Sequence, residues 1–82
     1  MPRYFFDVHH GEHHGGFAYD DEGSEFANFE DARKEAKAIL PEIARWEIPQ
    51  NGDNQAFTLV VRDEDGQIVY NATLTFAGLR PN

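Results

Sequence analysis

The first twenty residues alternate apolar and polar side chains, a period that is typical of strands. The alternation predicts a strand over residues 3–9 and a second strand over 14–19, joined by a type II′ turn at Gly11 and Glu12. The expected cross-strand pairs are Phe6–Phe17, Tyr4–Tyr19, Arg3–Asp20, His9–His14 and His10–His13. Two aromatic pairs on one face and a charge pair at the far end favour this hairpin.

Residues 29–46 change to the period of an amphipathic helix. The apolar stripe consists of Phe29, Ala32, Ala36, Ile39, Leu40, Ile43 and Trp46. Asn28 precedes the stripe as a helix N-cap, and Glu30 and Asp31 occupy the first turn, where the helix dipole favours negative charge. Pro41 interrupts the backbone hydrogen bonding, but the stripe continues past it. One helix kinked at Pro41 is therefore favoured over two separate helices.

Two further strands are predicted over residues 56–63 and 67–76, because apolar and polar residues alternate in both. Residues 63–66 (DEDG) join them as a turn. The apolar residues of these strands meet on one face only if odd-numbered residues pair with even-numbered ones. A two-residue or four-residue turn gives that parity, whereas a three-residue turn does not. Residues 78–82 are expected to fray.

These elements predict a single α+β domain over residues 1–82 with the order ββαββ. Two antiparallel hairpins are joined by one helix that packs on one face of the sheet. The other face carries Phe5, Val60 and Val69 among polar residues. This composition predicts a surface for self-association as a homodimer. The alternative is a set of scattered, exposed apolar residues without a partner.

Composition narrows the classes of protein to which the chain can belong. Its 82 residues are 40% hydrophobic, which is too apolar for a disordered chain, and its net charge is −8, which disfavours nucleic acid and anionic lipid as partners. A basic protein is a partner that this negative charge allows.

The chain has no cysteine, which excludes disulfides and thiolate zinc sites. The N-terminus is too short and too soon polar for a signal peptide, so we expect a cytoplasmic protein without membrane association.

All four histidines fall within six residues, at His9, His10, His13 and His14. In the predicted hairpin, His9 and His14 share a face with Asp7, which can add an oxygen ligand to a metal bound there, and His10 and His13 share the other face. Each cross-strand pair has Cβ atoms roughly 5 Å apart, which suits two imidazole ligands of zinc, nickel or copper. Two other interpretations are a solvated polar loop and a pH-sensing loop that gains positive charge below about pH 6.5.

The residues needed for catalysis are scarce. Ser24 is the only serine and lies in a turn, without the sequence context of a nucleophile. The carboxylate pairs also lie in turns, where water keeps their pKa values ordinary. We therefore predict no catalytic residue and no cofactor. The leading hypothesis is a non-enzymatic binding or regulatory domain that acts through protein–protein contacts. The alternatives are a metal-binding protein that uses the histidine hairpin and, more remotely, a small enzyme.

Four segments carry a resemblance to a known family. They are residues 2–7 (PRYFFD), residues 20–25 (DDEGSE), the helix positions Ala32, Arg33, Glu35 and Ala36, and residues 61–64 (VRDE) with Gly66. Taken together, they resemble a family of short bacterial proteins that is known only as a domain of unknown function. The resemblance extends along the whole chain and implies an intact, single-domain member. It implies no activity and no binding residues.

Overall fold

The computed structural model describes residues 1–10 and 16–81, and at His10 and Phe17 it describes the backbone alone. The elements are β1 (Arg3–His10), β2 (Gly16–Ala18), β3 (Ser24–Glu25), α1 (Phe29–Glu47), the 3₁₀ turn η1 (Ile48–Gln50), β4 (Asn54–Arg62) and β5 (Ile68–Ala77). The predicted α+β class is confirmed, as is the order of two strands, one helix and two strands. The short β3 and the turn η1 were not predicted.

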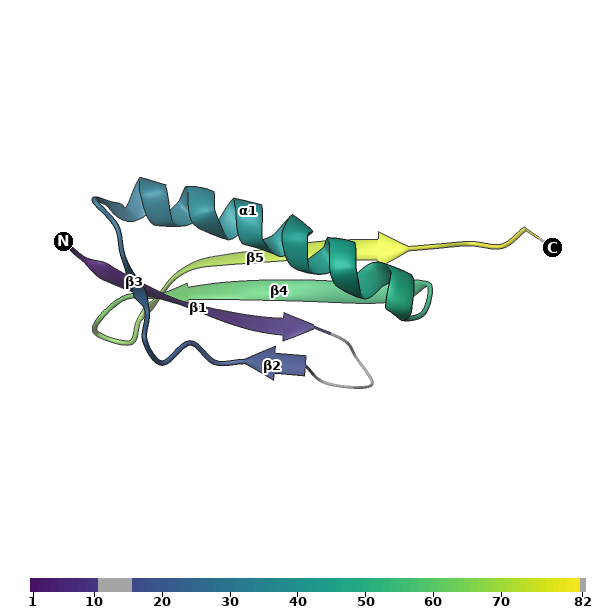
Figure 1. The fold of residues 1–82 in the computed structure, drawn as a ribbon, viewed down its shortest axis with the longest axis horizontal. Coiled ribbons are helices and arrows are strands. Elements are labelled where there is room, and N and C mark those ends of the chain that lie inside the picture. Colours follow the sequence, from purple (N-terminus) through teal and green to yellow (C-terminus); the bar gives the residue numbers. More distant parts are fainter. Residues whose placement is uncertain (11–15, 82) are drawn as a thin grey trace.

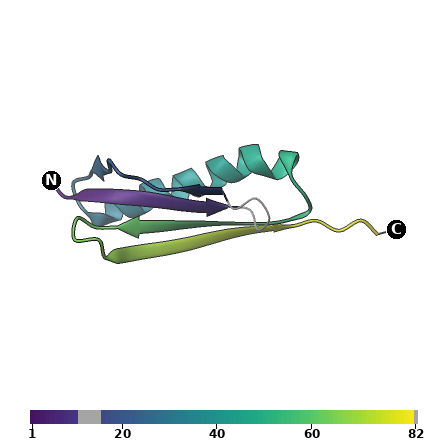
Figure 2. The ribbon, with the colours of Figure 1, turned by 90° about the horizontal axis from the view of Figure 1, so that it is seen from below.

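The strands form one antiparallel sheet in the order β2-β1-β4-β5. The two hairpins are joined where β1 pairs with β4, and the short β3 pairs with the start of β1. Helix α1 lies along one face of this sheet and contacts β4 and β5 (Figures 1 and 2). Strand β5 is the outermost strand on one side, and the chain leaves its end as an extended tail.

The core lies between α1 and the strands beneath it. Phe57, Leu59 and Val61 point from β4 towards the helix and are fully buried. The helix meets them with buried small residues and one leucine, namely Ala32, Ala36, Leu40 and Ala44. The small side chains allow the helix backbone to approach the sheet closely. Trp46, which the stripe placed in the core, is instead 66% exposed, because it lies about 120° around the helix from Leu40.

Helix α1 begins and continues as its sequence predicts. The side-chain oxygen of Asn28 accepts a hydrogen bond from the Asp31 N–H at 2.9 Å, which is the expected N-cap. The helix runs through Pro41 as one element, so the interpretation as two separate helices is wrong.

The register predicted for the first hairpin is wrong. His9 pairs with Phe17 and His10 with Gly16, while Tyr4 pairs with Ser24 and Arg3 with Glu25. The predicted pairs Phe6–Phe17, Tyr4–Tyr19 and Arg3–Asp20 therefore do not form. The predicted pairs His9–His14 and His10–His13 include residues outside the described part of the chain. Residues 11–15, which lie between the paired ends, are outside the described residues and include the predicted turn. The aromatic partner of Phe6 is Phe26, with ring centroids 5.7 Å apart. Arg3 pairs with Glu25 at 3.1 Å.

The second hairpin has the predicted parity but not the predicted turn. Phe57 pairs with Leu74, so odd and even residues oppose each other. The Asp63 N–H donates to the Gln67 carbonyl at 2.9 Å, which leaves a three-residue turn that ends at Gly66, with φ of +82°. A register shift between Val61 and Arg62 restores the parity, because β5 contains one extra residue there. The exclusion of a three-residue turn was therefore wrong.

We expect Pro41→Ala to raise the free energy of unfolding by about 1–3 kcal/mol. An alanine N–H at this position donates to the Lys37 carbonyl, and the proline ring no longer crowds the preceding turn. Pro41 is exposed, so no packing is lost. Urea unfolding followed by circular dichroism measures the change. An unchanged or lower stability would contradict the expectation and would show that the fold requires a proline at this point.

Candidate functional site

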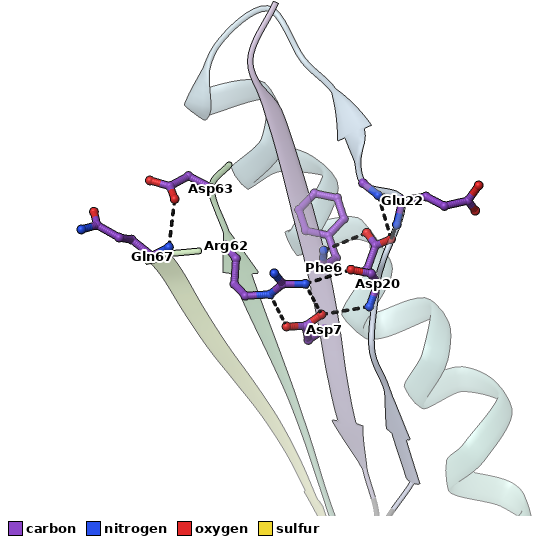
Figure 3. A network of polar contacts seen from close by, with 8 residues as sticks. Phe6, Asp7, Asp20, Glu22, Arg62, Asp63 and Gln67 are labelled. Carbon is purple, nitrogen blue, oxygen red and sulfur yellow. Dashed lines mark hydrogen bonds and ion pairs between the residues drawn. The ribbon is translucent and has the colours of Figure 1, made fainter. Parts of the chain in front are cut away.

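The most connected polar cluster lies on the sheet face away from α1, where Arg62 of β4 reaches Asp7 of β1 (Figure 3). The Arg62 Nε donates to Asp7 Oδ2 at 2.6 Å, and Nη2 donates to Asp7 Oδ1 at 3.2 Å. Nη2 also donates to the Asp20 carbonyl at 2.8 Å. The side chains of Asp7 and Arg62 are only 8% and 17% exposed, so this is a largely buried ion pair.

Asp20 attaches the segment that follows β2 to the same place. Its Oδ2 accepts from the Phe6 N–H at 3.0 Å, and its Oδ1 accepts from the Glu22 and Gly23 N–H groups at 3.2 and 2.9 Å. Its own N–H donates to Asp7 Oδ1 at 3.0 Å. These bonds fix where residues 20–23 lie along β1, and they account for the observed register of the first hairpin. The predicted pairing of Asp20 with Arg3 is incompatible with them.

Two aromatic rings contact the Arg62 guanidinium. Its central carbon lies 5.0 Å from the centroid of the Phe5 ring and 4.5 Å from that of the Tyr19 ring. Each contact has the geometry of a cation–π interaction. Gly23 packs directly against Phe5, since a Cβ at position 23 would lie 2.8 Å from a ring carbon. Aromatic and backbone groups therefore enclose the ion pair.

The environment keeps both carboxyl groups ionised. Burial raises the pKa of Asp7, but its bonds to Arg62 and to the Asp20 N–H outweigh burial and leave that pKa below its ordinary value. Burial also raises the pKa of Asp20, and the N–H groups of Phe6, Gly23 and Glu22 lower it by more. A general acid at neutral pH needs a pKa close to 7, so neither carboxyl suits that role. The cluster is suited to holding three segments together.

The predicted metal ligands are only partly described. His9 lies in β1 and is exposed, whereas His13, His14 and the side chain of His10 are outside the described residues. Both oxygens of Asp7 already accept hydrogen bonds from Arg62. Within residues 1–10 and 16–81, no three histidine or acidic side chains come together as metal ligands. A metal site at His9, His14, Asp7, His10 and His13 stays a prediction.

Sequence reasoning missed the roles of Arg62, Asp20 and Tyr19. A signal was present, however. Asp7, Asp20 and Arg62 come from three of the segments that carry the family resemblance, residues 2–7, 20–25 and 61–64. An arginine and two aspartates are the residue types of an ion cluster, but nothing in their spacing along the chain says that the three segments meet.

The comparisons with known proteins place the chain in a family without a known role. The pattern of the family described as "Domain of unknown function (DUF6894)" matches residues 3–75, and the chain belongs to this family. No curated protein and no solved structure shows a significant match. In the described part of the chain, no helix is long and apolar enough to cross a membrane.

We expect the protein to lose stability steeply below about pH 4. The pKa values of Asp7 and Asp20 are lowered in the folded state, so the unfolded chain binds protons first as the pH falls. The stability that these carboxylates contribute is complete above the ordinary aspartate pKa of about 3.9 and is lost as the pH falls through the lower, folded values. Urea unfolding between neutral and acidic pH measures it. Asp7→Asn is the control and should show a weaker pH dependence; an equal dependence would refute the assignment.

Gly23→Ala should destabilise the fold more than Gly66→Ala. Both glycines have positive φ, +71° and +82°, so an alanine costs about 1–2 kcal/mol of backbone strain at either position. Only Gly23 is crowded, because its added Cβ would meet Phe5, whereas nothing lies within 4 Å at Gly66. We expect an additional loss of about 1–3 kcal/mol for Gly23→Ala, measured by thermal or urea unfolding. Equal losses at the two positions would show that Phe5 moves aside freely.

Proposed function

We propose that the protein is a non-enzymatic, cytoplasmic binding or regulatory domain, and that it binds protein through the edge of β5. The observation that carries the proposal is the character of this strand. Ile68–Ala77 is ten residues long, contains no charged residue and no proline, and pairs on one side only, with β4, among the described residues. An edge of this kind can accept a further strand through its free N–H and carbonyl groups.

The distribution of charge supports β5 as the contact. The chain contains 15 acidic residues, and the last of them along the sequence is Asp65. Residues 67–82 contain no acidic residue and one basic residue, Arg80. An approaching protein therefore meets least repulsion along β5. The acidic remainder of the surface also favours a protein partner over nucleic acid, whose phosphates it repels.

The two edges of the sheet differ in how they are protected. Natural sheets discourage unwanted pairing with short edge strands, charges or prolines. On one side the edge strand β2 has only three residues. On the other side β5 has none of these devices, apart from the irregularity near Val69. Its large apolar residues remain accessible, with Ile68 64% exposed and Val69 and Phe76 each 38% exposed.

The sheet face opposite the helix is less accessible than the sequence predicted. Phe5 is partly buried against the Arg62 guanidinium and beside Gly23. Val60 is also partly buried. Of the three apolar residues that the sequence assigned to this face, only Val69 is exposed. The accessible apolar surface is thus displaced towards β5, which supports binding at the edge over binding across the whole face.

The proposal of a non-enzymatic role has its own support. Asp7, the buried carboxylate of the described residues, is paired with Arg62, and its bonds hold its pKa below the ordinary value. A general acid at neutral pH needs a pKa close to 7 instead.

Site-specific photo-crosslinking in the cell that produces the protein tests the proposal. A benzophenone amino acid at Thr73, an exposed residue in the middle of β5, should give crosslinks to protein. The same amino acid at Ala38, which is exposed on α1, is the matched control and should give few. Mass spectrometry identifies the crosslinked species. Protein crosslinks from Ala38 but not from Thr73 would refute binding through β5, and an absence of crosslinks from both would refute the binding role.

A further inference from the structure

We infer that the strand received by β5 is the β5 of a second copy of this chain, paired antiparallel about a twofold axis near Ala72. The inference rests on the proposed function, because it names the partner of the same edge. Ala72 lies in the middle of β5, opposite Leu59 of β4. An antiparallel pair about this point lets residues 68–76 of the strand oppose the same residues of the second copy.

The absence of charge along β5 is what self-pairing requires. In a twofold interface the same surface is used by both partners, so a charge near the axis lies close to its own copy. Like charges at neighbouring cross-strand positions are destabilising. A strand that binds a different protein has no such restriction, because opposite charges can be matched across the interface. In a chain with net charge −8, ten consecutive uncharged residues at the edge favour a second copy.

The position of Phe76 agrees with an antiparallel pair. Ile68 and Val69 begin β5, and Phe76 lies near its end. Antiparallel pairing about Ala72 brings the start of one β5 beside the end of the other. Phe76 opposes the buried Gln55 and so lies on the helix face, whereas Ile68 opposes Arg62 on the other face. Each Phe76 is then diagonal to Tyr70 of the second copy on the helix face, at a spacing that an aromatic side chain can bridge.

The core of the monomer also ends at β5. Tyr70, Ala72 and Leu74 pack against the core but are only partly buried. A twofold axis perpendicular to the sheet places both helices on the same side and continues the sheet from one copy into the other. The second β5 would then cover the open side of this row. Thr73 lies on the opposite face, where its hydroxyl is 3.2 Å from that of Thr58.

Charge reversal at Thr73 tests the inference. We expect the wild-type protein to sediment as a dimer, and Thr73→Lys and Thr73→Glu each to raise the dimer dissociation constant at least about tenfold. Mixing the two variants in equal amounts should restore a dimer, because opposite charges then meet near the axis. Ala38→Lys adds the same charge on the exposed side of α1 and should leave the dimer unchanged. Circular dichroism establishes that each variant is folded.

A cysteine variant provides an independent measurement if the charged variants do not fold. The chain has no cysteine, so any disulfide of Thr73→Cys must join two chains. Pairing about Ala72 places Asn71 opposite Thr73 of the second copy, so a mixture of Thr73→Cys with Asn71→Cys should crosslink under mild oxidation faster than a mixture of Thr73→Cys with the control Ala38→Cys. A wild-type protein that stays monomeric at submillimolar concentration would overturn the inference, as would a dimer that neither Thr73→Lys nor Thr73→Glu weakens.

The outcomes separate this inference from the proposed function. If the wild-type protein is monomeric and a photo-crosslinker at Thr73 captures a different protein, β5 is a binding edge for that protein and only the second copy is refuted. If the protein is monomeric and Thr73 gives no protein crosslink, both are refuted. A crosslinked species of two identical chains supports both.

Discussion

The buried ion pair between Asp7 and Arg62 is the interaction on which the arrangement of the sheet depends. It joins β1 to β4 through two residues that are 55 positions apart in the sequence, and through Asp20 it also holds the segment after β2. Removing one partner from such a pair leaves a buried charge without compensation, which is costly. Any alternative pairing of β1 that separates these groups carries that cost. The pair therefore helps to select one register from several that apolar patterning alone would allow.

This long-range constraint explains which predictions from the sequence held. The helix with its Asn28 cap and the four main strands follow from local periodicity, and periodicity is a property of neighbouring residues. The register of the first hairpin was misjudged because Phe17 and Tyr19 offered plausible aromatic partners within the hairpin. The actual partner of Phe6 is Phe26, and the position of the chain is set by Asp20. Neither contact has a local signature.

The same cluster clarifies what the family resemblance contains. Asp7, Asp20 and Arg62 lie in three separate segments that carry the resemblance, and in the fold they bind one another. Part of the recognisable pattern thus consists of residues that hold the sheet together. Because these three residues position strands, their share of the resemblance bears on the architecture of the chain. A residue that serves recognition must be sought outside the cluster.

The cluster also limits where recognition can occur. It fills the sheet face over β1 and the end of β4 with paired charges and the rings that contact Arg62, so this region has few unsatisfied groups to offer a partner. The helix covers the opposite face. Among the described residues, the edge of β5 offers backbone groups without a strand partner and side chains without charge. The charged residues of β1 and β4 fix the arrangement of the sheet. Strand β5 contains no charged residue, and its outer edge is therefore able to pair.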